Sequence, residues 1–89
     1  MQVANWEVFP TELQAALIQT HPGIAWRAAL DAGDGAAQEP AGVVVWARRR
    51  GVEVEVRVSK ALIAHEYLPE LLQDIYEEAE TRLSGGTRP

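Results

Sequence analysis

The sequence predicts a small α+β domain, in which an antiparallel sheet of three or four strands carries helices on one face. Valines alternate strictly with polar residues over 52–59, as is typical of a half-buried strand. The run 43–48 just before it is apolar and β-branched, so it can supply the partner strand of a hairpin. From Lys60 onward the apolar period becomes helical. We therefore expect one helix, three strands and two helices, with an optional strand in front.

The first part of the chain predicts a helix and a strand. Residues 2–9 could form a short strand, although their alternation is poor. Thr11 and Gln14 have the spacing of a capping box, which predicts a helix from Thr11 to Thr20. The helix is expected to end at the His-Pro-Gly sequence of 21–23. Its apolar stripe would consist of Leu13, Ala16, Leu17 and Thr20.

A second strand is expected at 24–31, and a loop of small residues and turn formers at 32–41. Asp31 and Asp34 in that region only loosely match the spacing of a calcium loop, so a plain turn is the favoured interpretation. The strand would place alternate residues on the buried side: Ile24, Trp26, Ala28 and Leu30.

The turn of the predicted hairpin lies within Arg49-Arg50-Gly51. We expect a three-residue loop with Gly51 in the left-handed region, because glycine adopts positive φ at little steric cost. The alternative is a two-residue type I′ turn at Arg50-Gly51, which requires positive φ at a bulky residue.

This turn decides which side chains are buried, because a one-residue slip moves every side chain to the other face. The three-residue loop places Trp46 opposite Val54 in the core, beneath the helices. The two-residue turn would expose Trp46 beside Glu55. In the expected register the open face of the sheet would carry Val43, Val45 and Ala47.

The C-terminal part predicts two helices. Pro69 suits the first turn of a helix but not its interior, so a break is expected near Leu68. The last helix would run from Pro69 to Leu83 and end in a glycine cap at 84–86. One domain is thus expected over 1–86, with a disordered tail at 87–89. The predicted helical stripes consist of Leu62, Ile63 and Tyr67, and of Leu68, Leu72, Ile75, Ala79 and Leu83.

Composition restricts the class of protein. The formal net charge is −5, which argues against strong nucleic-acid binding at physiological salt. The sequence has no cysteine, no signal-peptide pattern and no apolar stretch near the roughly 20 residues that span a bilayer. A cytoplasmic location without membrane association is therefore expected.

Residues with catalytic potential are few. His21 precedes Pro-Gly at a helix end, His65 lacks an orienting acid on its own helical face, and neither serine has a nucleophile-elbow context. The HExxH and glycine-rich nucleotide motifs are missing from the sequence. We therefore expect no enzyme, no metal, no cofactor and no small-molecule substrate.

Charge is segregated along the chain. Arginines gather at the hairpin turn, and acidic residues gather on the last helix. A basic tip can contact phosphate or an acidic partner, and an acidic helix can recognise a basic surface. Together with the apolar part of the open sheet face, these groups give the candidate partner-binding residues: Arg48, Arg49, Arg50, Glu70, Asp74, Glu77, Glu78, Val43 and Val45.

The order helix, three strands, helix is similar to that of the double-stranded RNA-binding domain, and VSKALIAH stands where that family starts its second helix. That family contacts phosphates through a lysine cluster, whereas only Lys60 is basic at this helix start. The resemblance is one of element order, which carries no function by itself.

The function expected from the sequence is a non-enzymatic protein–protein interaction module, such as a small acidic adaptor, a chaperone-like subunit or an inhibitor. The alternatives are a nucleic-acid-contacting domain that uses the arginine-rich tip and an accessory subunit of an enzyme. A protein partner or a homodimer through the sheet face or a sheet edge is expected.

Overall fold

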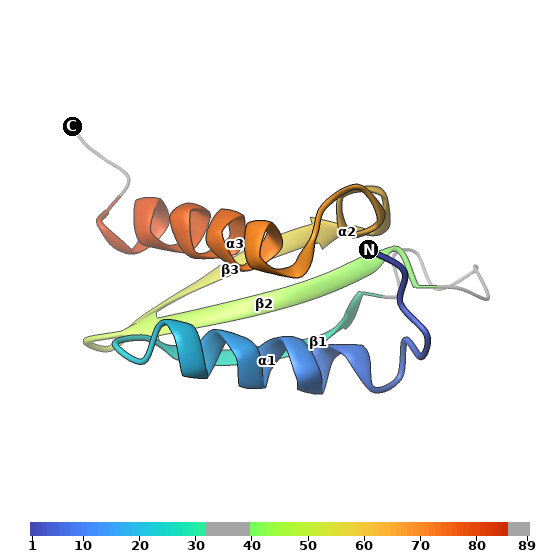
Figure 1. The fold of residues 1–89 in the computed structure, drawn as a ribbon. Coiled ribbons are helices and arrows are strands. Elements are labelled where there is room, and N and C mark those ends of the chain that lie inside the picture. Colours follow the sequence, from blue (N-terminus) through green and yellow to red (C-terminus); the bar gives the residue numbers. More distant parts are fainter. Residues whose placement is uncertain (32–39, 86–89) are drawn as a thin grey trace.

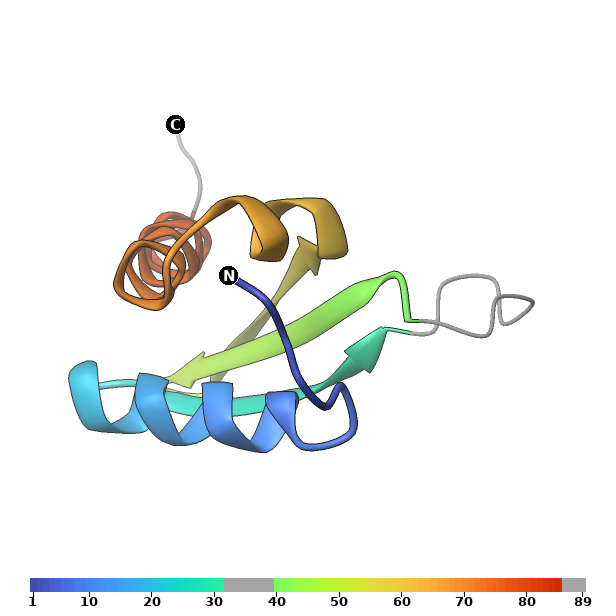
Figure 2. The ribbon, with the colours of Figure 1, turned by 45° about the vertical axis from the view of Figure 1, so that its right-hand side comes forward.

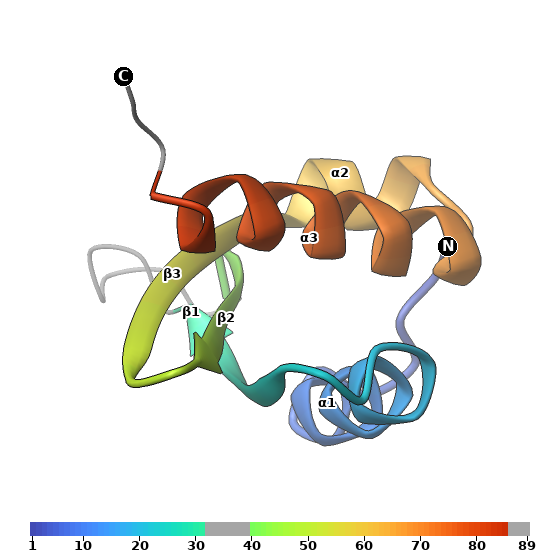
Figure 3. The same ribbon diagram turned by 90° about the vertical axis from the view of Figure 1, so that its left-hand side faces the viewer.

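The computed structural model describes residues 1–31 and 40–85 and confirms the α+β class (Figure 1). Three antiparallel strands form one sheet in the order β1-β2-β3. Helix α1 packs mainly on β1 and α3 mainly on β3, so that the curved sheet holds both long helices on one side (Figure 3). The elements are α1 Phe9–Thr20, β1 Ala25–Asp31, β2 Gly42–Arg49, β3 Val52–Ser59, α2 Lys60–His65 and α3 Leu68–Leu83.

Most of the expected loop at 32–41, including Asp34, lies outside the described residues, as do Gly86 of the expected glycine cap and the tail at 87–89. The described part of the cap agrees with the prediction, because Gly85 has φ of 89° and follows Ser84, the C-cap of α3. The helix break before Pro69 is also confirmed, since α2 ends at His65 and α3 begins at Leu68.

The hairpin has the two-residue turn, and the expected three-residue loop is wrong. Arg50 and Gly51 have φ of 53° and 79°, and Arg49 pairs with Val52. Positive φ at a residue such as arginine costs about 1–2 kcal/mol. The turn matches the right-handed twist of the flanking strands, and in its register Val43, Val45 and Ala47 of β2 are fully buried.

Three residues of β2 expected on the open face are therefore in the core. Val43, Val45 and Ala47 are each 0% exposed and face the helices together with alternate valines of β3. Trp46 lies on the opposite face, paired with Glu55, and is only half-buried. Trp26 of β1 is buried and sits opposite the small Ala47, which leaves room for its indole ring.

The start of the chain differs from the prediction. Residues 2–9 form no strand, and α1 begins at Phe9, two residues before the expected cap at Thr11. Pro10 explains the earlier start, because proline favours the first turn of a helix. Val8 is the N-cap and its side chain makes no capping bond, so the predicted capping box is not formed.

The helical stripes are confirmed in their central parts. Leu13 and Leu17 of α1 and Ile63 of α2 are almost fully buried. On α3, Leu71 is buried in addition to the expected residues, whereas Leu68 at its first turn is 38% exposed. Leu62 and Tyr67, which were expected in one stripe with Ile63, are 37% and 76% exposed, so that part of the prediction is wrong. Val8 and Ile18 are exposed as well.

Candidate partner-binding cleft

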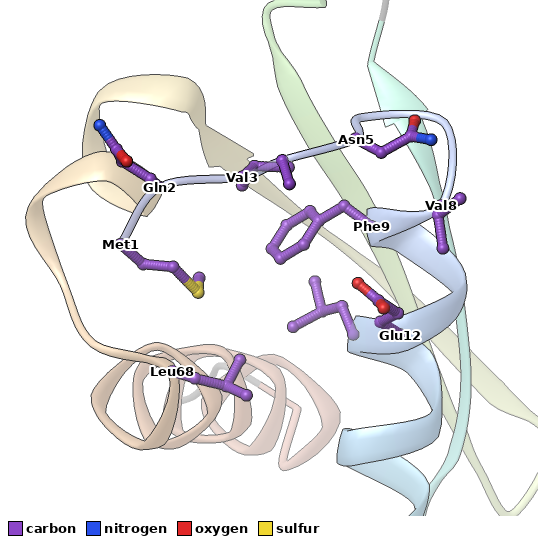
Figure 4. Close-up of a pocket in the computed structure, with 10 residues that line it drawn as sticks. Met1, Gln2, Val3, Asn5, Val8, Phe9, Glu12 and Leu68 are labelled. Carbon is purple, nitrogen blue, oxygen red and sulfur yellow. The ribbon is translucent and has the colours of Figure 1, made fainter.

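An apolar cleft of about 530 Å³ opens at the end of the molecule where α1 and α3 begin. The irregular segment at 1–5 forms one wall, since it runs from beside α2 and α3 down to the start of α1 (Figure 2). Figure 4 shows the side chains of Met1 and Phe9 directed into the cleft, with Leu68 facing them from the first turn of α3.

The floor of the cleft belongs to the core, and its rim is exposed. Phe9 and Leu13 lie one helical turn apart on the same face of α1 and are 5% and 1% exposed. At the rim, Val8 is 44% exposed and Leu68 is 38% exposed, while the neighbouring Tyr67 is 76% exposed. Exposed apolar side chains at the rim of an apolar cleft are a common feature of interaction sites.

The N-terminal wall is tied to α2 by the amino group of Met1, which donates to the carbonyls of Ala64 at 2.8 Å and of Glu66 at 2.9 Å. A positive group at the C-terminal carbonyls of a helix is favourably placed. Val3 of this segment and Trp6, which follows it, pack against the core. The wall is thus held at several points, although it has no regular secondary structure.

One carboxylate lines the cleft, and a separate acidic group lies around the start of α3. Glu12 is part of the cleft lining, and Glu70 lies in the first turn of α3, where its side chain accepts from the backbone N–H of Tyr67 at 3.1 Å. A hydrogen bond with Asp74, partial burial and the nearby charges of Asp74 and Glu70 raise the pKa of Glu66. The Oε1 atom of Glu66 has no hydrogen-bond partner within residues 1–31 and 40–85. Glu66, Glu70 and Asp74 thus lie close enough to one another to interact electrostatically.

The four predicted acidic residues of α3 are all exposed, but their surroundings differ. Glu77 accepts from Gln73 at 2.9 Å, and Glu78 pairs with Arg82 at 2.8 Å in the second half of the helix. Glu70 and Asp74 lie in the first half of the helix, and Asp74 lines a hollow together with Arg57 and Arg82. None of these four predicted residues is part of the cleft lining.

The predicted arginine tip is not a single basic patch. Strand alternation sends Arg48 to the open face, where it pairs with Glu53, and Arg50 occupies the turn. Arg49 points to the helix side and donates to both carboxylate oxygens of Glu80, at 2.7 and 2.9 Å.

The ion pair between Arg49 and Glu80 belongs to a cluster that sequence reasoning missed. Hydrogen bonds from Arg49 hold the pKa of Glu80 at about 2, and the hydrogen bond with Glu80 raises the pKa of Tyr76. The ring of His21 stacks on Tyr76 with 4.0 Å between centroids. These contacts join α3 to the hairpin and to the end of α1, so we interpret them as structural.

The open face of the sheet is largely covered by its own charged side chains. Arg27 lies over the ring of Trp46, with its Cζ 4.2 Å from the ring centroid. Arg57 contacts Glu55 at 2.8 Å and Asp31 at 3.6 Å. Because Val43 and Val45 are in the core, they cannot be the partner contacts that were expected on this face.

At each outer edge of the sheet, a side chain from a helix forms a hydrogen bond with the backbone of the edge strand. The side-chain oxygen of Gln14 on α1 accepts from the N–H of Ala28 in β1 at 3.0 Å. On the opposite edge, Arg82 of α3 donates to the carbonyl of Glu55 in β3. Such contacts occupy groups that could otherwise pair with a strand of another molecule. Association through the face or an edge thus has less support than the sequence suggested.

Within residues 1–31 and 40–85, no group of three or more histidine or acidic side chains is arranged to hold a metal ion. None of the helices in this part of the chain combines the length and apolar character needed to cross a membrane. The comparisons with protein-family models, with curated proteins and with solved structures give no match to the chain.

The cleft was not predicted from the sequence, because its walls come from three separate segments. In two of these three segments, the sequence contained a local signal for the apolar groups of the cleft. Val8-Phe9 directly precedes Pro10, and Leu68 directly precedes Pro69, so both apolar groups stand where a proline starts a helix. What brings these two helix starts together is the packing of α1 and α3 on one sheet.

Proposed function

We propose that this protein is a non-enzymatic protein–protein interaction module that holds an apolar segment of a partner in the cleft between the starts of α1 and α3. The observation that carries the proposal is the combination of an apolar floor at Phe9 and Leu13 with the exposed apolar rim at Val8 and Leu68. The proposal keeps the cytoplasmic location expected from the sequence.

A protein segment suits this cleft better than a small polar substrate. Small-molecule sites usually bring several polar groups together on the ligand, whereas the side chains of Gln2 and Asn5 point away from this cleft (Figure 4). The arginine tip gives the nucleic-acid alternative little support, because Arg49 is engaged by Glu80. An accessory subunit of an enzyme remains one form of an interaction module.

Site-specific photo-crosslinking tests the proposal. A photoreactive phenylalanine analogue at position 8 should crosslink a protein partner in cells, and the same analogue at position 18 should not. Ile18 is the matched control, because it is as exposed as Val8 and does not line the cleft. A Leu68→Ser change should reduce the crosslink at position 8. Equal crosslinking from both positions, or none from position 8, would contradict the proposal.

A further inference from the structure

The β3 edge of the sheet is covered at only one of its residues. β3 is an outer strand, and successive residues of such a strand direct their backbone groups alternately to the neighbouring strand and away from it. Because the carbonyl of Glu55 accepts from the side chain of Arg82, Glu55 faces away from β2. Arg57, two residues further on, faces the same way, and in the described part of the chain no hydrogen bond from outside the sheet reaches its N–H or C=O. Arg57 therefore offers both backbone groups to an additional strand.

A hollow of about 250 Å³ lies directly beside this edge, between β3, α2 and α3. Its wall on α3 consists of residues one turn apart, which share a helix face: Asp74, Glu78 and Arg82. Val56 and Ile75 in its lining are 4% and 2% exposed and form an apolar floor, while Leu62 of α2 is 37% exposed at its rim. The strand edge and the helix face are thus two walls of one groove, with apolar side chains between them.

Arg82 crosses one end of this groove. Its guanidinium donates to the carbonyl of Glu55 and contacts Glu78 at 2.8 Å. The N–H that it donates takes the place that the N–H of an added strand would have on this carbonyl. The side chain of Arg82 is 48% exposed, so it can leave Glu55 for solvent while its charge stays beside Glu78. An extended backbone is therefore the chemistry that fits this edge.

We propose that the groove between β3 and α3 binds an extended segment of a partner protein, which pairs with the backbone of Arg57, displaces Arg82 from Glu55 and places an apolar side chain in the hollow. Side chains alternate along a strand, so the segment carries apolar residues toward α3 and polar residues toward the open face of the sheet. Backbone hydrogen bonds supply the affinity of such a complex, and the hollow supplies its specificity. The groove shares no lining residue with the cleft at the helix starts, so this inference does not rest on the proposed function.

Three peptides test this choice of partner on the full chain. The first is a short peptide in which valine and threonine alternate, with a lysine at each end for solubility. The second is the same peptide with its backbone amides N-methylated, and the third replaces its valines by serines. In NMR titrations the first peptide should shift the backbone amides of Glu55 and Arg57 and slow hydrogen exchange at Arg57, whereas the amide of Ala28 on the other edge should not change. It should bind at least about tenfold more tightly than the N-methylated peptide.

Matched variants locate the groove. Leu62→Ser should weaken the valine–threonine peptide about threefold to tenfold, because it removes an apolar group from the hollow. Ile18→Ser, at an exposed apolar position away from the hollow, should leave the affinity unchanged. Arg82→Ala should strengthen binding about threefold, because the carbonyl of Glu55 is then open to the peptide. Unchanged or weaker binding by the Arg82→Ala protein would overturn the displacement of Arg82.

The remaining results judge the partner itself. Equal binding of the N-methylated peptide would overturn backbone pairing, and equal binding of the serine peptide would overturn the role of the hollow. Shifts at Val8 and Leu68 in place of Arg57 would put the peptide in the cleft, which supports the proposed function and overturns this inference. Protection of the Arg57 amide that grows with protein concentration in the absence of peptide would identify a second copy of the chain at this edge and overturn the choice of partner. Absence of binding by the valine–threonine peptide overturns the inference as well.

Discussion

The register of the hairpin can be tested by comparing two tryptophans on opposite faces of the sheet. Trp26 is 5% exposed and lies in the core, where its Nε1 also donates to the carbonyl of His21 at 3.0 Å. Replacing it with alanine should cost about 3–5 kcal/mol. Because a chain of this size has a stability of roughly 4–13 kcal/mol, the Trp26→Ala protein should be largely destabilised or unfolded.

Trp46→Ala should have a much smaller effect, because this side chain is on the open face. It loses the contact with Arg27, which is worth about 0.5–1 kcal/mol at an exposed site, and a cross-strand contact with Glu55, worth about 0.2–1 kcal/mol. These two contacts sum to about 1–2 kcal/mol, which corresponds to a fall in Tm of roughly 5–15 °C for a domain of this size, and the apolar surface covered by the half-buried ring adds to this cost. The stability of both variants can be measured by thermal and urea unfolding, followed by circular dichroism.

An Arg27→Ala background supplies the control. If Arg27 lies on the ring of Trp46, the Trp46→Ala change should cost about 0.5–1 kcal/mol less when Arg27 is already absent. The reasoning would be refuted if Trp46→Ala destabilised the protein as much as Trp26→Ala. That outcome would place Trp46 in the core and restore the three-residue loop.

Three further predictions concern the turn, a carboxylate and a sheet edge. Gly51→Ala should lower the stability by about 1 kcal/mol in urea unfolding, because φ at this position is 79°; an unchanged midpoint would contradict the left-handed conformation of Gly51. The pKa of Glu80 is lowered to about 2, so its carboxylate stabilises the fold above pH about 4.5 and this contribution is lost as the pH falls toward 2. The pH dependence of unfolding should therefore be shallower in the Glu80→Gln variant, and a parallel profile would exclude this role. Gln14→Ala should free the N–H of Ala28 and cause concentration-dependent association in sedimentation, whereas Gln19→Ala at an exposed position of the same helix should not; equal behaviour would show that the edge is not protected in this way.

Glu66, near the start of α3, makes an opposing contribution to the pH dependence of stability. The raised pKa of Glu66 means that the folded state holds its proton more tightly than the unfolded state does. Stability from this group therefore rises as the pH falls through its raised pKa. Glutamine resembles the protonated acid, so Glu66→Gln should increase the stability at pH 7, as measured by urea unfolding. A decrease would mean that the charged form of Glu66 is required.

The sequence by itself determined the element types and their order. The alternating valines of 52–59 and the helical period after Lys60 depend on local geometry, and both predictions are confirmed. Pro69 likewise predicted where the last two helices separate, because proline lacks the N–H needed inside a helix. At the start of the chain the same rule applied to Pro10 would have been a better guide than the capping pattern at Thr11.

Only the tertiary structure decided the register and the cleft. A turn that looks unfavourable at Arg50 is accepted because the whole of β2 then places Val43, Val45 and Ala47 under two helices. The cleft and the Arg49–Glu80 pair join segments that are far apart in the sequence. The physical reason is that a local rule counts the cost of one turn or one cap, whereas the free energy of a register sums the burial of every side chain in the sheet.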